Sequence, residues 1–371
     1  MSRFLSSKYE DLEPYTPGEQ PKNMKKLIKL NTNENPYDPA PEVLLAINNE
    51  EIEKLRLYSD PEAAPLIEAA AGFYGVGRDM VMAGNGSDEV LAFLFMAFQQ
   101  KSGRFYFPEI SYSFYPVYCS VFGAEAVKVP LKEDFSIDPS DYYGVDGTLI
   151  ITNPNAPTGI ALALADIEEI LQHNPEQLVV IDEAYVDFGA ESAVSLLNKY
   201  DNLLVVQTLS KSRSLAGARV GLAISNKEII EDLNRIKFSF NPYNLNRLSI
   251  LAGTELVRYT RKKTVTEALK DVEYFNDTRT WIIKTRETFV AQMEALGFTV
   301  LPSKANFVFA THPDMAGQTY FEKLRERQII VRHFKDPKIC EYVRITIGTP
   351  EAMDALVEAT KEILEEERQD A

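Results

Sequence analysis

Short apolar runs rich in β-branched residues alternate with helical patterns over about residues 100–225. Near-continuous apolar runs separated by helices are typical of strands that are buried on both faces of a mostly parallel sheet. A helical pattern covers 165–172, and the longest apolar run, VLAFLFMAF (90–98), predicts a buried helix because it is too short to span a membrane. We therefore predict an α/β fold. Its predicted strands are RFYF (104–107), AVKV (126–129), TLIIT (148–152), LVVID (178–182), LLVVQT (203–208) and VGLAI (220–224).

The pattern changes after about residue 245. A long helical region with many charged residues covers about 245–296. Short strand patterns follow it, and an acidic amphipathic helix covers 350–368. We interpret this part as a smaller α+β domain, and we expect the irregular, proline-rich first 45 or so residues to pack against it or against another subunit. The strand patterns are FTVLP, NFVFA, IIVRHF and YVRITIG. The predicted domains are an arm with part of the small domain (1–48), a large domain (49–255), and a linking helix with the small domain (256–371).

Composition limits the classes of function. The 371 residues, 45% hydrophobic and 25% charged, are typical of a soluble globular chain of about two domains. A net charge of −16 and the lack of a basic cluster argue against nucleic acid as a partner. The N-terminus has no signal-peptide pattern, Cys119 and Cys340 cannot form a disulfide framework, and the histidines lack metal-ligand spacing. We predict a cytoplasmic protein with no metal and no membrane partner.

Two strand ends carry polar residues that suit a cleft, since functional groups in such sheets collect at the carboxyl ends of strands. Asp182 ends LVVID and is either a helix cap or a carboxylate aimed into a cleft, where it would hold a positive charge. Tyr185 follows it, either as a half-buried core residue or as a phenol in the same cleft. TLIIT leads into the turn NPNAPTG (153–159), which holds the amide of Asn155.

Two further segments suit an anion. In GNGSDEVLAFLF (84–95), Ser87 or Gly86 caps a helix whose exposed backbone amides could also hold a phosphate, although neither nucleotide-binding glycine motif is present. In TLSKSRSLAGARVG (208–221), Lys211 is accompanied by Ser210, Ser212 and Arg219. Together these groups suit pyridoxal phosphate: a lysine for a Schiff base, an aspartate for a ring nitrogen, an amide and a phenol for a ring oxygen, and a phosphate-binding helix start.

The order of the motifs carries a family resemblance over essentially the whole chain. The motifs are LNTNENPY (30–37), LRLYSDP (55–61), GNGSDE (84–89), SYSFY (111–115), NPNAPTG (153–159), VVIDEAY (179–185), TLSKSRSLAGARVG (208–221) and VRITIGT (343–349). They resemble the fold-type I, class II pyridoxal-phosphate-dependent aminotransferases, and most closely the histidinol-phosphate aminotransferases among them. The resemblance implies a large domain with a mostly parallel seven-stranded sheet between helices, a smaller α+β domain, and a homodimer.

The resemblance also implies roles for the cofactor-binding residues. Lys211 would form the Schiff base and shuttle the proton, Asp182 would keep the ring nitrogen protonated, and Tyr185 and Asn155 would contact the 3-hydroxyl oxygen. The family usually has asparagine where this chain has Ala156, so Asn155 is the nearest replacement. The remaining implied contacts are Tyr112 stacked on the ring; Ser87, Asp88, Ser210 and Arg219 at the phosphate; and Tyr58 at the phosphate of the neighbouring subunit.

The implied reaction is a step of histidine biosynthesis. The amino group of L-histidinol phosphate would pass to 2-oxoglutarate, giving imidazole-acetol phosphate and L-glutamate. Tyr15, Asn33, Arg332 and Arg344 match substrate-binding positions, and arginines suit phosphate and carboxylate groups. Three alternatives stay open: an aromatic amino acid aminotransferase, a threonine-phosphate decarboxylase of the same fold, and a non-catalytic pyridoxal-phosphate-binding protein.

Overall fold

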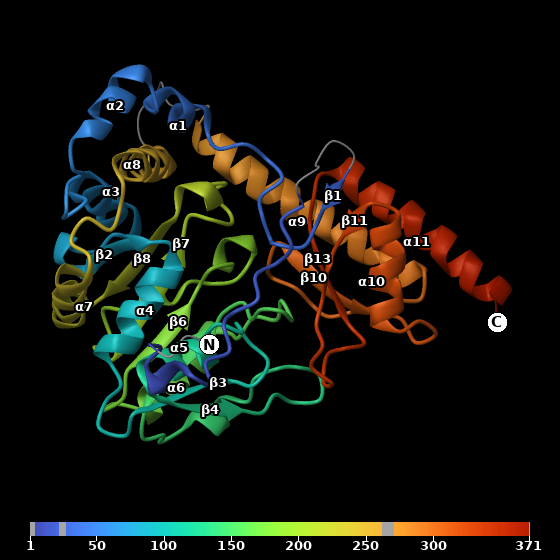
Figure 1. The fold of residues 1–371 in the computed structure, drawn as a ribbon, viewed down its shortest axis with the longest axis horizontal. Coiled ribbons are helices and arrows are strands. Elements are labelled where there is room, and N and C mark those ends of the chain that lie inside the picture. The colour runs from blue at the N-terminus through green and yellow to red at the C-terminus, as the bar shows by residue number, and fades with distance from the viewer. Residues whose placement is uncertain (1–3, 22–26, 262–270, 371) are drawn as a thin grey trace.

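The structure is a computed structural model that describes residues 4–21, 27–261 and 271–370. Its large sheet has seven strands in the order β2-β8-β7-β6-β5-β3-β4 (Figure 1). From β4 to β7 the strands are parallel, whereas β8 runs antiparallel to both of its neighbours. The strands are β2 (Val81–Asn85), β3 (Arg104–Pro108), β4 (Glu125–Val129), β5 (Thr148–Thr152), β6 (Val179–Asp182), β7 (Leu203–Thr208) and β8 (Val220–Ser225).

The strands predicted for this sheet are confirmed to within one residue at each end. The seventh strand, β2, was not among the predicted runs. Its sequence, VMAGN, has only a short apolar stretch before a glycine and an asparagine, which are both poor strand formers. Antiparallel pairing with β8 holds it in the sheet along its whole length.

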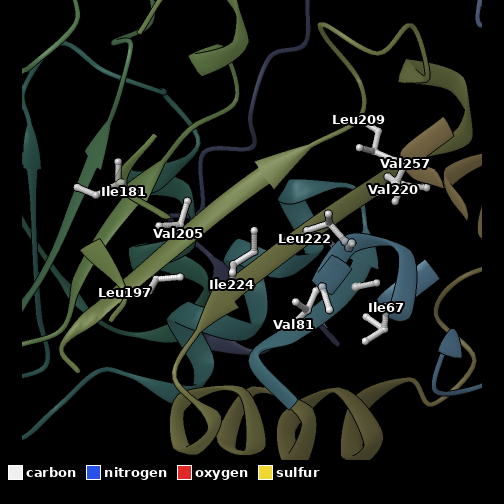
Figure 2. Packing of buried hydrophobic residues seen from close by; sticks show 14 of the residues in the cluster. Ile67, Val81, Ile181, Leu197, Val205, Leu209, Val220, Leu222, Ile224 and Val257 are labelled. Atoms are coloured by element: carbon white, nitrogen blue, oxygen red, sulfur yellow. The ribbon is translucent and has the colours of Figure 1, made fainter. Parts of the chain in front are cut away.

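Helices cover both faces of the sheet because alternate strand residues point to opposite sides. On one face, Ile151, Ile181 and Val205 belong to a core cluster that also includes residues of α3 (Ala64–Tyr74), α6 (Leu164–His173) and α8 (Arg247–Arg261). Figure 2 shows part of this packing. On the other face, Ile150, Val180 and Leu204 pack with α4 (Ser87–Ala97), α5 (Tyr115–Phe122) and α7 (Lys227–Phe240). The predicted helices at 90–98 and 165–172 are thus confirmed as α4 and α6.

A second, antiparallel sheet has the order β12-β13-β10-β9 and lies beside the large one (Figure 1). It corresponds to the strands predicted after residue 296, with differences in length. The patterns FTVLP and YVRITIG form shorter strands, NFVFA forms a strand of equal length that begins one residue later, and IIVRHF forms two short strands of which the second belongs to this sheet. The elements are β9 (Thr299–Val300), β10 (Phe307–Thr311), α10 (Gly317–Glu326), β11 (Ile329–Ile330), β12 (Arg332–His333), β13 (Val343–Thr346) and α11 (Pro350–Asp370). No helix in the described part of the chain is long and apolar enough to cross a membrane.

The predicted helical region from 245 to 296 consists of α8 and α9 (Asp271–Ala295), and its middle lies outside the described residues. The N-terminal segment packs against the C-terminal part of the chain, as expected, because β1 (Ile28–Lys29) pairs with β11 in a separate two-stranded sheet. Two short helices, α1 (Pro41–Ala46) and α2 (Asn49–Glu53), then lead to the large sheet. The domain boundaries given above stay predictions.

Candidate active site

The topology of the large sheet brings several chain segments to one edge. β5, β6 and β7 are parallel, so Thr152, Asp182 and Thr208 end at the same side. β8 is antiparallel to β7, and therefore begins at that side with Arg219 just before it. β2 is antiparallel to β8 and ends there at Asn85, two residues before Ser87 at the start of α4. Segments from 85 to 220 thus meet at one edge.

Two adjoining cavities lie at this edge. The first, which we name the inner cavity, has a volume of about 370 Å³ and the second, the outer cavity, about 150 Å³. Five residues line both cavities and mark their junction: Thr32, Tyr112, Ala156, Tyr185 and Lys211. The inner cavity holds these predicted cofactor-binding residues: Ser87, Asp88, Tyr112, Asp182, Tyr185, Ser210, Lys211 and Arg219. The outer cavity holds all four predicted substrate-binding residues: Tyr15, Asn33, Arg332 and Arg344.

Asp182 lies at the floor of the inner cavity and is 3% exposed. Its Oδ2 accepts a hydrogen bond of 2.8 Å from Tyr115, whose hydroxyl is also 2.8 Å from Thr152 Oγ1. Its Oδ1 has no hydrogen-bond partner among the described residues. Burial raises the pKa of Asp182 to about 6, against the opposing effect of the Tyr115 hydrogen bond. A buried carboxylate oxygen without a partner can accept a bond from a cationic N–H group of a ligand.

Lys211 follows β7 on a loop whose backbone is held by side chains. Asn35 donates its amide to the carbonyl oxygens of Lys211 and Ser212, at 3.2 and 3.1 Å. Ser212 donates to the carboxylate of Asp187. The Lys211 ammonium lies 5.8 Å from the centre of the Tyr185 ring and 3.4 Å from the carbonyl oxygen of Thr32. The amine therefore lies at the junction of the two cavities on a positioned loop.

The start of α4 and Arg219 form one end of the inner cavity. Gly86 has a φ of +79°, and a Cβ atom there would lie 2.3 Å from Arg219 Nη2, so the close approach of the guanidinium needs glycine. Arg219 forms a 2.8 Å ion pair with Asp88, and Tyr112 also donates to Asp88 at 2.8 Å. The first N–H groups of a helix lack intrahelical acceptors, so this end is suited to a phosphate.

The outer cavity is cationic. Arg344, on β13, donates to the carbonyl oxygen of Asn31 at 2.9 Å, and its Nε has no partner among the described residues. Burial lowers the pKa of Arg344. Arg332, on β12, donates to the carbonyl oxygens of Thr16 and Pro17 at 3.2 and 3.4 Å. Tyr15 packs against Phe114, with ring centres 4.7 Å apart. Two guanidinium groups in one small cavity suit an anionic substrate.

Two of the predicted site residues line neither cavity. Asn155 turns its amide toward the carbonyl oxygen of Ile110, at 2.9 Å, and toward Thr158 Oγ1, at 3.1 Å. The neighbouring Ala156 lines both cavities instead. Tyr58 is 79% exposed and stacks on Tyr243 at 4.5 Å, outside both cavities. Contact of Asn155 with a cofactor stays a prediction, and so does contact of Tyr58 with a neighbouring subunit.

Sequence reasoning missed other residues of the site. Tyr115, the last residue of SYSFY, bonds to Asp182, and Thr208 Oγ1 donates to Ser210 Oγ at 2.9 Å. Thr32, inside LNTNENPY, lines both cavities and has a buried hydroxyl without a partner. All three belong to motifs that the resemblance quotes, which was the available signal. A further cavity of about 710 Å³, beside residues 73–76 and 186–198, contains none of the predicted site residues.

The residues of the inner cavity fit pyridoxal phosphate. The buried, unpartnered Oδ1 of Asp182 suits a protonated ring nitrogen, and the cradle between Gly86 and Arg219 suits a phosphate at the other end. Lys211 and Tyr185 lie between them at the junction. The fit requires the Asp88 carboxylate, which pairs with Arg219, to share that guanidinium with the phosphate.

Comparisons with known proteins agree with this geometry. Residues 25–359 match the family aminotransferase class I and II. The histidinol-phosphate aminotransferase of Brachyspira hyodysenteriae is 50% identical over 98% of this chain and 99% of its own length. That of Pseudomonas putida is 51% identical over 97% and 99% of the two chains. The structure of histidinol-phosphate aminotransferase from Sinorhizobium meliloti in complex with pyridoxal-5'-phosphate has a TM-score of 0.81 at 23% identity, covering 94% and 92%.

Proposed function

The chain belongs to the class I and II aminotransferase family, and we propose that it transfers the amino group of L-histidinol phosphate to 2-oxoglutarate with pyridoxal phosphate. The observation that carries the proposal is that the inner cavity, with Asp182 and Arg219, adjoins a cavity with two arginines, and that one amine lies at their junction. The identity of about 50% to histidinol-phosphate aminotransferases over nearly the full length supports the substrate.

When bound, pyridoxal phosphate supplies an aldehyde that bonds to amines and a ring that withdraws electrons from the carbon beside the nitrogen. Asp182 would accept a hydrogen bond from the protonated ring nitrogen on its free Oδ1, and so would keep the ring cationic. Tyr115 supports this by bonding the other oxygen of the carboxylate at 2.8 Å, which leaves Oδ1 directed to the ligand. The carboxylate thus maintains the electron demand of the ring.

Lys211 moves the proton. Among the described residues that line the cavities, it carries the single amine group. With the cofactor and substrate bound, Lys211 Nζ would take the proton from the substrate carbon that carries the nitrogen. The loop bonds from Asn35 keep the lysine backbone in place during this step. General acid–base work of this kind contributes roughly 10²- to 10⁴-fold to a rate.

Arg332 and Arg344 bind the anionic ends of the substrates. L-Histidinol phosphate carries a phosphate and 2-oxoglutarate carries two carboxylates, so one pair of arginines can serve both halves of the reaction. The half-buried Arg344 has a buried, unpartnered Nε that can join a bidentate contact. Tyr15, packed on Phe114, lines the same cavity as the two arginines.

A homodimer completes the proposal. Exposed apolar side chains gather in α1, in the segment after α2 and at the end of α7, and Figure 1 shows these helices at the end of the molecule opposite α11. The residues are Leu44, Leu45, Leu55, Leu57, Tyr58, Phe238, Phe240 and Tyr243. Burying such a patch against a second copy would bring Tyr58 to the phosphate of the partner's site. Sedimentation of the holoenzyme tests this, and a fully active monomer would contradict it.

The substrate is tested by a single-turnover experiment. The purified holoenzyme, without a keto acid, is mixed with L-histidinol phosphate, and its absorbance and the released product are followed. We expect the long-wavelength cofactor band to disappear as imidazole-acetol phosphate forms. An unchanged band with L-histidinol phosphate, but conversion by phenylalanine, would favour an aromatic aminotransferase. Release of carbon dioxide from threonine phosphate would identify the decarboxylase. The cytoplasmic location stays a prediction.

A further inference from the structure

Asn33 joins the two cavities through hydrogen bonds of its side chain. It is 1% exposed and has a φ of +56°, a left-handed conformation that asparagine tolerates better than most residues. Its Nδ2 donates to the hydroxyl of Tyr185 at 2.9 Å, and its Oδ1 accepts from the hydroxyl of Thr346 at 3.1 Å. Both polar atoms of the amide are therefore occupied by the protein itself.

Thr346 determines which way the amide of Asn33 points. The threonine hydroxyl accepts the backbone N–H of Asn33 at 3.0 Å, so its own hydrogen is left to be donated. The acceptor of that hydrogen is Oδ1, which directs the NH₂ group toward Tyr185. Thr346 is 3% exposed, and its backbone N–H bonds to Leu30, so the hydroxyl is held in place.

The phenol of Tyr185 is an acceptor toward Asn33 and a donor elsewhere. Because the NH₂ group of Asn33 supplies a hydrogen to the phenolic oxygen, the phenol's own hydrogen is not used in that contact. No described residue accepts it. Tyr185 lines both cavities, so its hydrogen is available to a ligand at the junction. A donor that also accepts a hydrogen bond is a stronger donor.

Ala156 increases the importance of this phenol. It lines both cavities beside Tyr185 but offers only a methyl group, and the amide of Asn155 faces Ile110 and Thr158 instead. At the junction, Tyr112 already donates its hydroxyl to Asp88. At the junction, Tyr185 therefore offers a ligand a hydroxyl whose hydrogen-bond direction is set by the buried residues Asn33 and Thr346.

We propose that Thr346 and Asn33 are positioning residues that force Tyr185 to donate its hydrogen to the ring oxygen of the bound cofactor. The inference rests on the cofactor part of the proposed function and is independent of the amino donor. We name the hydrogen bonds from Thr346 through Asn33 to Tyr185 the relay. Thr346 lies two residues after Arg344 on β13, so the relay also connects the phenol to the strand that carries the substrate arginine. The titratable and charged groups that interact with the phenol include Lys211, Arg344 and Tyr15, and none of the variants below changes them.

The test is the pH titration of the long-wavelength absorbance of the holoenzyme, which reports protonation of the nitrogen beside the ring oxygen. A bond donated to that oxygen stabilises its anion and lowers the proton affinity of the nitrogen. Loss of this hydrogen-bond donor therefore raises the pH midpoint of the absorbance titration. We expect Tyr185→Phe to raise it by about one pH unit, and Thr346→Val, which frees the amide to turn, by about half a unit.

The double variant gives the sharpest discrimination. If the relay acts only through Tyr185, Thr346→Val added to Tyr185→Phe shifts the midpoint no further. Equal shifts of Thr346→Val in both backgrounds would overturn the relay. Asn33→Gly keeps the left-handed backbone and removes the amide, so it provides a second route to the same test. A wild-type midpoint in Asn33→Gly would also overturn it.

Two controls separate the relay from packing. Thr346→Ser keeps the hydroxyl and is expected to keep the wild-type midpoint. Thr360→Val removes another buried threonine hydroxyl, 2.7 Å from that of Tyr320 and outside both cavities, so we expect it to lower stability and leave the midpoint unchanged. A shift in Thr360→Val equal to that in Thr346→Val would overturn the proposal. A wild-type protein with no cofactor band would instead overturn the cofactor assignment itself.

Discussion

The inner and outer cavities are built in different ways. The inner cavity is formed by strand ends of one sheet, so adjacent strands fix the spacing of Asp182 and of the segments that carry Lys211 and Arg219. The outer cavity joins residues far apart in the sequence, such as Tyr15 and Arg344, through contacts between side chains and backbone. We therefore expect inner-cavity variants to change the chemical step and outer-cavity variants to change substrate binding.

The largest effect is expected at Lys211. Lys211→Ala removes the amine that moves the proton, so kcat should fall by more than about a thousandfold. The cofactor should remain bound without a covalent bond. Turnover and the absorbance spectrum measure both effects. Lys199→Ala, on an exposed ion pair with Glu168, is the matched control and should leave both unchanged. Normal turnover in Lys211→Ala would refute the assignment of the site.

Asp182 provides a pH test of the inner cavity. Because burial raises its pKa to about 6 in the free protein, the carboxylate must lose a proton before it can accept the ring N–H group. Affinity for pyridoxal phosphate should therefore fall as the pH drops below about 6, by up to about tenfold per pH unit. Asp182→Asn should bind more weakly at pH 7 and lose this component of the pH dependence. Spectroscopic titration with pyridoxal phosphate at several pH values measures the affinity. If Asp182→Asn kept the pH profile of the wild type, the proposed role of Asp182 would be refuted.

Arg344 tests the contrasting behaviour of the outer cavity. Arg344→Lys keeps the charge but loses the planar, bidentate donor, so KM for 2-oxoglutarate should rise by about tenfold or more. The kcat should change much less, because the inner cavity is untouched. Steady-state kinetics with each substrate separates the two parameters. A fall in kcat with unchanged KM would remove the distinction between the cavities.

The smallest expected spectral effect is at Asn155. Its amide bonds to Ile110 and Thr158, away from both cavities, so Asn155→Ala should lower the free energy of unfolding by about 1–2 kcal/mol. The pH midpoint of the cofactor band should stay within about 0.2 units of the wild-type value. Chemical denaturation and the absorbance titration measure the two effects. A clear shift of the midpoint would restore the predicted contact with the ring oxygen.

Local sequence patterns point to the inner cavity more directly than to the outer one, for a physical reason. Buried strands have a strong hydrophobic pattern, and parallel pairing brings their ends together, so Asp182 and the segment of Lys211 could be placed from pattern and topology. Tyr15 and the two arginines have no such pattern and entered only through the resemblance. β2 was missed because VMAGN owes its strand conformation to pairing with β8 rather than to its own propensities.

The direction of individual side chains was beyond the reach of the sequence. NPNAPTG predicts a turn at a strand end, but the contacts of Ile110 and Thr158 decide where the amide of Asn155 points. The bond from Asn33 to Tyr185 joins residues 152 positions apart, and no local pattern reports it. Likewise, Tyr115 reaches Asp182, the last residue of β6, from the start of α5. Such contacts depend on the assembled fold.

The measurement that tests the account most directly is the site of covalent attachment of the cofactor. The holoenzyme is reduced with borohydride, digested, and examined by mass spectrometry for the pyridoxyl group. The account predicts the label on Lys211, in the peptide that follows β7. A label on another lysine, or no label in a protein that shows the cofactor band, would contradict the central role of Lys211 at the junction of the two cavities.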